Sequence, residues 1–134
     1  MIKLAPSVFA ADFMNMEEDI KAIERAGCPY AHVDVMDGHF VPNINFGPAI
    51  VSALRPVTNM VLDVHLMITD PEKYVDTFLD AGADLITVHV ETGADFEKIA
   101  EKIKAKGKKF AMSLSPATDI SAIGDGTLTG AVST

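Results

Sequence analysis

Residues 32–43, HVDVMDGHFVPN, contain a short apolar strand that breaks into a polar loop. Side chains alternate between the two faces of a strand, so His32, Asp34 and Met36 are expected to share one face. An imidazole and a carboxylate arranged in this way can form part of a metal site, or a base with its partner. The alternative is a structural His–Asp hydrogen bond at the end of a strand.

A second apolar segment, residues 60–67, repeats this design. It carries His65 near its carboxyl end, and Asp63 is expected on the same face. Two strands that each place a polar group just before a loop predict one shared site at the carboxyl edge of a parallel sheet. Asp63 lies deeper along its strand, where we expect it to be the hydrogen-bond partner of an imidazole.

Strands and helices alternate along the chain with a repeat of roughly 25 to 30 residues, the length of a βα unit. Glycines close three of the expected helices and lead directly into strands: Gly27, Gly82 and Gly107. This pattern predicts a (β/α) barrel or a doubly wound sheet, and the absence of a GxGxxG motif after any strand favours the barrel. We expect strands at residues 2–9, 30–36, 60–67, 84–90 and 108–114.

The regular pattern ends near residue 123. A fifth helix is expected to begin at Pro116–Asp119, which gives about four and a half βα units in residues 1–123. Residues 124–134 are rich in glycine and threonine and are expected to be irregular, with at most one short strand at residues 130–133. We therefore expect a partial barrel domain followed by a tail.

Composition limits the possible partners and compartments. The 134 residues carry 11 basic and 19 acidic side chains, a net charge of −8, which argues against non-specific binding to nucleic acid or to an anionic membrane. A single cysteine, Cys28, excludes an internal disulfide. The sequence shows neither a signal peptide nor a membrane-spanning segment, so a cytoplasmic location is expected.

Several motifs resemble the ribulose-phosphate 3-epimerase family. These are LAPSVFAADF at residues 4–13, HVDVMDGHFVPN at 32–43, LDVHLM at 62–67, GADLITVH at 82–89 and SPAT at 115–118. The resemblance covers roughly residues 2–123. It implies a (β/α)8 TIM-barrel fold, of which this chain holds a part, and epimerisation at C3 between ribulose 5-phosphate and xylulose 5-phosphate in the pentose phosphate pathway. The allulose-6-phosphate 3-epimerase branch is the nearest alternative.

The same resemblance implies roles for six residues. His32, Asp34 and His65 would bind one divalent metal ion, and Asp34 would also act as one acid/base. Ser7 and His65 would contact the sugar phosphate, and Met36 and Met67 would line the space beside the reacting carbon. Zn²⁺, Fe²⁺ and Mn²⁺ all suit two imidazoles and a carboxylate. His89 is expected to be structural or adjacent to substrate, and His39 to be solvated.

The family pattern is incomplete in this sequence. Later strands of family members supply a second aspartate, which is both a metal ligand and the opposite acid/base, and later loops supply the phosphate site. Three hypotheses follow: an incomplete epimerase, an inactive truncated half-barrel, or a non-catalytic module whose copies associate. The strand edges of a partial barrel predict a homo-oligomer in each case.

Overall fold

The computed structural model describes residues 2–123 and 132–133. Its centre is a six-stranded sheet with the order β2-β1-β3-β4-β5-β6. Strands β1 (Tyr30–Asp37), β3 (Val61–Met67), β4 (Leu85–His89) and β5 (Lys109–Ser113) run parallel to one another, as does the two-residue β6 (Val132–Ser133). Strand β2 (Ile44–Asn45) pairs antiparallel with β1.

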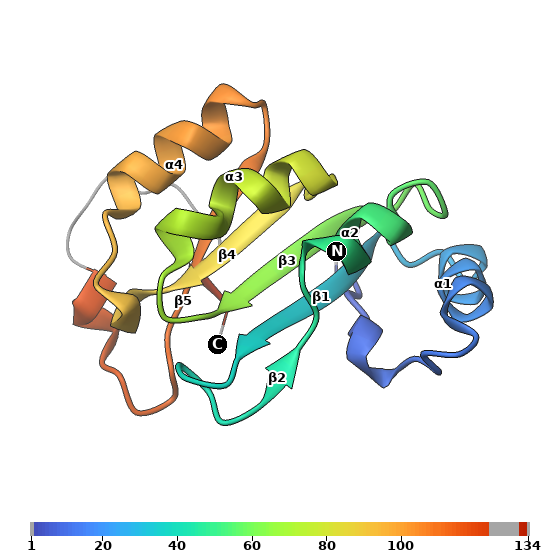
Figure 1. Ribbon diagram of the computed structural model, residues 1–134, viewed down its shortest axis with the longest axis horizontal. Helices are drawn as coiled ribbons and strands as arrows, with labels where there is room; N and C mark the ends of the chain where they lie inside the picture. Colours follow the sequence, from blue (N-terminus) through green and yellow to red (C-terminus); the bar gives the residue numbers. More distant parts are fainter. Residues whose placement is uncertain (1, 124–131, 134) are drawn as a thin grey trace.

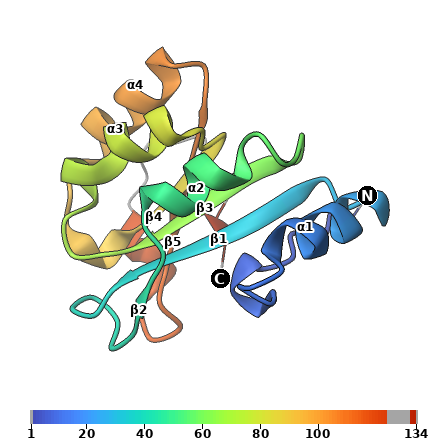
Figure 2. The same ribbon diagram turned by 45° about the vertical axis from the view of Figure 1, so that its right-hand side comes forward.

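Three of the four α-helices in the described part of the chain follow strands of the sheet as βα units. Helices α2 (Pro48–Leu54), α3 (Pro71–Ala81) and α4 (Phe96–Ala105) lie along one face of the sheet, and α1 (Met16–Arg25) lies beside β1 (Figures 1 and 2). No helix in the described part of the chain is long and apolar enough to cross a membrane. The expected succession of βα units is confirmed for α2, α3 and α4, whereas α1 follows a 3₁₀ turn and no strand.

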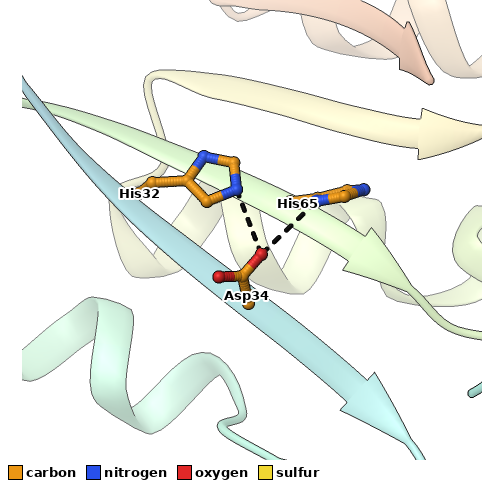
Figure 3. Close-up of side chains that lie close together, drawn as sticks. All are labelled: His32, Asp34 and His65. Atoms are coloured by element: carbon orange, nitrogen blue, oxygen red, sulfur yellow. Dashed lines mark hydrogen bonds and ion pairs between the residues drawn. The ribbon is translucent and has the colours of Figure 1, made fainter. Parts of the chain in front are cut away.

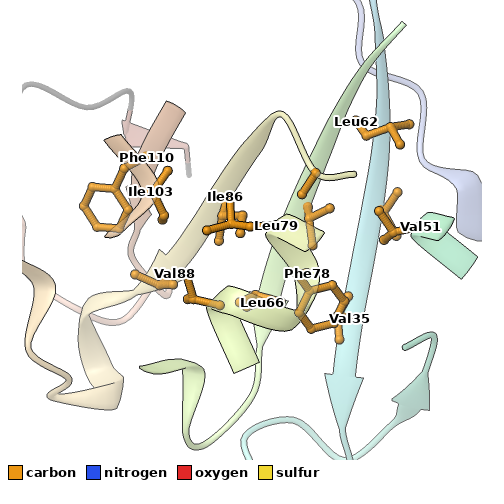
Figure 4. Packing of buried hydrophobic residues seen from close by; sticks show 14 of the residues in the cluster. Val35, Val51, Leu62, Leu66, Phe78, Leu79, Ile86, Val88, Ile103 and Phe110 are labelled. Carbon is orange, nitrogen blue, oxygen red and sulfur yellow. The ribbon is translucent and has the colours of Figure 1, made fainter. Parts of the chain in front are cut away.

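The sheet has a helix-covered face and a site-bearing face. In β1 and β3 every second residue is buried, whereas the residues between are only half-buried. The buried set packs against the helices around Phe78 and Ile103 (Figure 4): it includes Val33, Val35, Leu62, Val64, Leu66, Ile86 and Val88, each at most 5% exposed. Each Å² of apolar surface buried on this face contributes about 25 cal/mol of stabilising free energy, and this contribution holds the helices against the sheet. The alternate positions, including His32 and Asp34, remain available for chemistry.

The expected strand at residues 2–9 was wrong. A 3₁₀ helix, η1 (Val8–Ala10), forms there, and an isolated parallel bridge joins Ser7 to His32. Ser7 caps this helix by accepting a hydrogen bond from the backbone nitrogen of Phe9. Pro6 has no backbone N–H, so it cannot donate to a sheet ladder. Its carbonyl nevertheless accepts from the nitrogen of His32 at 2.9 Å, which holds the segment against β1.

Two further expectations near the ends of elements need correction. The loop after β1 forms a hairpin with β2, closed by a hydrogen bond from the nitrogen of Gly38 to the carbonyl of Asn43 at 2.8 Å. The fifth helix expected from Pro116 is a single 3₁₀ turn, η3 (Ile120–Ile123), in which Asp119 accepts from the nitrogen of Ser121. Residues 132–133 form β6, within the short strand that the sequence allowed. The rest of the tail lies outside the described residues, so the two-part division of the chain stays a prediction.

Candidate metal-binding active site

The structure brings His32, Asp34 and His65 together on the site-bearing face (Figure 3). Their candidate ligand atoms all lie within 4.8 Å of one another. Oδ1 of Asp34 is 3.0 Å from Nε2 of His32 and 3.4 Å from Nδ1 of His65. The register explains this convergence, because Asp34 on β1 lies directly beside His65 on β3. The three side chains lie close together, as expected from the sequence, and their roles in one site stay a prediction.

Asp63 holds the outer nitrogen of the His32 ring. Its Oδ2 lies 2.8 Å from Nδ1 of His32, the residue next to it in the register. Asp63 therefore partners an imidazole, as expected from the sequence. The ring is His32 on the neighbouring strand, and not His65 on its own strand. A carboxylate on the second nitrogen fixes the orientation of a ligating imidazole.

The hydrogen bonds around His32 and Asp34 shift the pKa values of both residues. Hydrogen bonds to Asp34 and then Asp63 outweigh burial and raise the pKa of His32 to about 10. Burial opposes ionisation of Asp34, but hydrogen bonds from His32, His65 and Ser7 hold the pKa of Asp34 below its usual range. Asp34 is therefore a carboxylate at neutral pH.

Ser7 contacts Asp34 directly. Its hydroxyl donates to Oδ2 of Asp34 at 2.7 Å, so the two oxygens of this carboxylate have different neighbours. Asn45, which is buried, donates from its side chain to the backbone carbonyl of Asp34 at 3.2 Å. The segments on both sides of β1 thus hold the carboxylate in position.

Met36 and Met67 are register partners at the carboxyl ends of β1 and β3. Both are half-buried. A hollow of about 500 Å³ lies between β1, α2 and α3. Its lining includes Met36, Asp37, Thr69 and Tyr74. His32, Asp34 and His65 do not line that hollow, so it is separate from the three-residue cluster.

Two further residues extend the cluster. Nε2 of His89 lies 2.8 Å from Nε2 of His65, and the two rings stack with centroids 4.9 Å apart. Nδ1 of His89 lies 3.2 Å from Oε2 of Glu91. Burial lowers the pKa of His89 and the neighbouring His65 lowers it further, although the Glu91 carboxylate acts in the opposite direction.

Sequence reasoning did not identify Glu91. Burial opposes its charge, but hydrogen bonds from Thr118 and the backbone of Ser115 lower the pKa of Glu91 to about 2. The available signal was the His-x-Glu spacing at the end of β4, which repeats the two-residue spacing of His32 and Asp34.

The donor set fits a divalent cation. Two imidazole nitrogens and one carboxylate oxygen lie within 4.8 Å of one another, and each imidazole has its second nitrogen engaged by another residue. This combination of donors suits zinc and other first-row divalent ions. The fold and the site together define an α/β protein with a parallel sheet and a candidate metal centre on one face of that sheet.

Comparison with known proteins identifies the family. A model described as the ribulose-phosphate 3 epimerase family matches residues 3–128. The chain therefore belongs to the ribulose-phosphate 3-epimerase family, whose members are metal-dependent TIM-barrel isomerases. The resemblance to this family and the barrel-type fold, both expected from the sequence, are confirmed.

Individual relatives agree with this assignment. Ribulose-phosphate 3-epimerase of Bacillus subtilis (strain 168) is 48% identical over 123 residues, which are 92% of this chain and 57% of the relative. That of Synechocystis sp. is 52% identical over 121 residues, covering 89% of this chain and 53% of the relative. The chloroplastic ribulose-5-phosphate-3-epimerase of Arabidopsis thaliana is 49% identical over 91% of this chain and 44% of its own length. The chain thus spans about half the length of these curated relatives.

Proposed function

We propose that this chain carries a metal-assisted 3-epimerase site for a ketose phosphate, with ribulose 5-phosphate as the first candidate substrate. The observation that carries the proposal is the Asp34 carboxylate, held between the imidazoles of His32 and His65. The names of the relatives support the substrate class.

Asp34 would take up or return the proton at C3. It is ionised at neutral pH, because its hydrogen bonds hold its pKa below the usual range. An ionised carboxylate next to the reacting carbon can act as a general base. Ser7, hydrogen-bonded to Oδ2 of Asp34, would orient the carboxylate and contact the substrate.

His32, Asp34 and His65 would hold the cation, for which Zn²⁺, Fe²⁺ and Mn²⁺ are the candidates. A bound ion of this kind supplies polarisation of the substrate carbonyl next to C3. Met36 and Met67 would provide an apolar, polarizable wall that does not compete for the proton. His65 would also contact the substrate.

Inversion at C3 needs a second acid on the opposite face. The candidate cluster of the described residues contains one carboxylate, Asp34. A single acid/base can remove the C3 proton and return a solvent-derived one to the same face, which exchanges hydrogen without inversion. We therefore expect the 134-residue chain to catalyse deuterium exchange faster than epimer formation.

The test incubates ribulose 5-phosphate with the chain in deuterated buffer containing Zn²⁺ or Fe²⁺, followed by proton NMR. Deuterium should enter at C3, and Asp34→Asn should abolish this exchange. Asp76→Asn, on the exposed face of α3, is the matched control and should leave the exchange unchanged. Exchange that persists in Asp34→Asn would overturn the role of Asp34. Formation of xylulose 5-phosphate at about 1–1000 per second would show that a second acid acts on the opposite face.

A further inference from the structure

A second hollow lies at the amino edge of the parallel sheet. It has a volume of about 520 Å³ and is bounded by the amino ends of β3, β4 and β5 and by the segment that follows α2. It shares no lining residue with the cluster of His32, Asp34 and His65. Pockets that take small molecules have volumes of about 300–1,000 Å³. The hollow is therefore of a size that suits a small molecule.

The lining of this hollow is basic, although the chain as a whole is acidic. Arg55, Lys108 and Lys109 line it beside a single carboxylate, Asp84. Three positive charges less one negative charge leave a surplus of two, whereas the whole chain has a net charge of −8. Glu24 contacts the backbone of one lining residue, so the surplus is at least one. A cleft lined by one sign of charge concentrates ions of the opposite sign.

Asp84 holds two of the three cations in place. Its Oδ1 accepts from Nζ of Lys108 at 2.7 Å, and its Oδ2 accepts from Arg55 at 2.6 Å and from the backbone nitrogen of Leu62 at 3.0 Å. One carboxylate thus serves two cations with both of its oxygens engaged. The side chains of Arg55 and Lys108 are 32% and 33% exposed. A ligand that meets groups already held in position loses less side-chain entropy on binding.

The two lysines supply hydrogen-bond donors that a ligand can use. An ammonium group has three N–H donors, and the one contact of Lys108 to Asp84 leaves two of them. Lys109, the exposed first residue of β5, forms no ion pair within the described part of the chain. The space beside Gly107 is open, because no atom lies within 4 Å of an added Cβ there. A ligand can therefore reach both ammonium groups.

Other lysines nearby differ from Lys109 because each has its own acidic partner. Three lysines in and directly after α4 pair with three acids of α3: Lys98 with Glu72, Lys102 with Asp76 and Lys106 with Asp80. These pairs neutralise the facing surfaces of the two helices. The positive charge at the amino edge of the sheet is not neutralised in the same way.

We propose that this hollow binds a small anion that carries a phosphate group. Lys108 and Lys109 donate to the phosphate oxygens, Arg55 adds charge, and the side-chain amide of Asn59 is a further donor on the lining. A phosphate monoester carries a charge of about −1.5 to −2 at neutral pH, which balances the surplus of the lining. Lysine is a usual phosphate ligand in proteins. This site is independent of the proposed epimerase site.

The test titrates the metal-free, ¹⁵N-labelled chain with inorganic phosphate, at an ionic strength held constant with chloride. The amide signals of Gly107, Lys108 and Lys109 should shift in ¹H–¹⁵N spectra and reach saturation. Lys109→Gln keeps a polar side chain and removes the charge, so it should weaken phosphate binding about tenfold or more, the scale of one hydrogen bond to a charged group. Lys109→Glu reverses the charge and should abolish the saturable shift.

Lys73→Gln, at an exposed position of α3, is the matched control and should bind phosphate as the unchanged chain does. Lys109 is also exposed, so its variants should unfold at the same urea concentration as the unchanged chain. Equal phosphate affinity in Lys109→Gln and the unchanged chain would overturn the proposal, as would equal shifts with chloride alone. Shifts confined to residues around Asp34 would overturn it too, because phosphate would then bind at the candidate active site. Deuterium exchange at C3 tests the epimerase site separately, so the two proposals fail independently.

Discussion

Nδ1 of His32 and Oδ2 of Asp63 lie 2.8 Å apart across two neighbouring parallel strands. The residues are direct partners in the register of β1 and β3, so the contact needs no bend in either strand. Asp63 is half-buried, and its Oδ1 is buried without a hydrogen-bond partner among the described residues. A buried oxygen without a hydrogen-bond partner costs free energy. The contact of the other oxygen, Oδ2, with His32 offsets part of that cost.

Asp63→Ala should therefore weaken the binding of Zn²⁺ by about 10–100-fold, because the His32 ring loses the partner that orients it. The measurement is a competition titration of metal affinity. Asp76→Ala, at the exposed end of an ion pair with Lys102, should bind Zn²⁺ as the unchanged chain does. Equal affinities for the two variants would contradict the role assigned to Asp63.

The same pair predicts a dependence of stability on alkaline pH. The pKa of His32 is raised from 6.5 to about 10, chiefly by Asp34 and then by Asp63. A raised pKa means that the folded state binds the proton more tightly than the unfolded state. This contribution is complete below pH 6.5 and is lost as the pH rises toward 10. Denaturant unfolding of the metal-free chain should show this decline, and Asp63→Ala should make it smaller. A decline of the same size in the unchanged chain and in Asp63→Ala would contradict the contribution assigned to the His32–Asp63 pair.

Much of the fold could be predicted because local chemistry and tertiary packing agree. The apolar stripes of α1 and α3 and the glycine after α3 reflect requirements that act within one or two turns of chain. The shared site could also be predicted from the sequence. Alternation along a strand fixes which side chains point together, and parallel strands bring their carboxyl ends to one edge.

The features that the sequence did not specify depend on partners distant in the sequence. Residues 2–9 have the composition of a strand, but Ser7 caps a 3₁₀ turn and pairs with β1 at one position only. The choice of His32 as the partner of Asp63 depends on the register of two strands, which neither strand specifies alone. The contact between His89 and His65 likewise joins residues 24 positions apart. Periodicity contains no information on such distances.

Gly82 tests the junction between α3 and β4. Its φ is 113°, and an added Cβ would lie 2.9 Å from Cγ and Cδ of Arg55. Arg55 cannot move freely, because it donates to Asp84 and to the carbonyl of Thr58, each at 2.6 Å. Gly82→Ala should therefore lower the free energy of unfolding by about 1–3 kcal/mol, from left-handed strain and the displaced side chain.

Gly47→Ala is the matched control for Gly82. Its φ is −141°, and no atom lies within 4 Å of an added Cβ. The substitution should change the free energy of unfolding by less than about 1 kcal/mol, and it can be stabilising because alanine restricts the unfolded chain. Urea unfolding compares the two variants, and equal effects would show that neither strain nor Arg55 matters at Gly82.

Self-association is the next expectation, and it rests on exposed apolar side chains. Met14 is 94% exposed, Ile44 is 81% exposed and Phe13 is 52% exposed. The rings of Phe13 and Phe46 also meet, with centroids 5.3 Å apart, so part of this apolar surface is continuous. Sedimentation velocity should show species larger than a monomer at micromolar concentration, and Ile44→Lys should shift the distribution toward the monomer. A sharp monomer with cooperative unfolding would contradict the expected homo-oligomer.

Asp37 predicts the acid side of the stability profile. Its Oδ1 accepts from the backbone nitrogens of His39 and Phe40, at 2.9 and 2.8 Å. Its Oδ2 accepts from the nitrogen and the hydroxyl of Thr69, at 2.7 and 2.9 Å, and so joins the loop after β1 to the loop after β3. Burial opposes the charge, but these hydrogen bonds outweigh it and lower the pKa of Asp37.

A lowered pKa contributes stability above the ordinary value of 3.8, and that contribution is lost as the pH falls below it. Asp37→Ala should therefore lower the free energy of unfolding at neutral pH by about 1–2 kcal/mol, the scale of hydrogen bonds to a charged acceptor. It should also flatten the loss of stability between neutral and strongly acidic pH. Asp76→Ala removes a carboxylate of an exposed ion pair and should leave the acid slope nearly unchanged. If Asp37→Ala retained the full acid slope, other carboxylates would have to account for it, and the bridge from Asp37 to Thr69 would contribute little to the stability of the loops above the site.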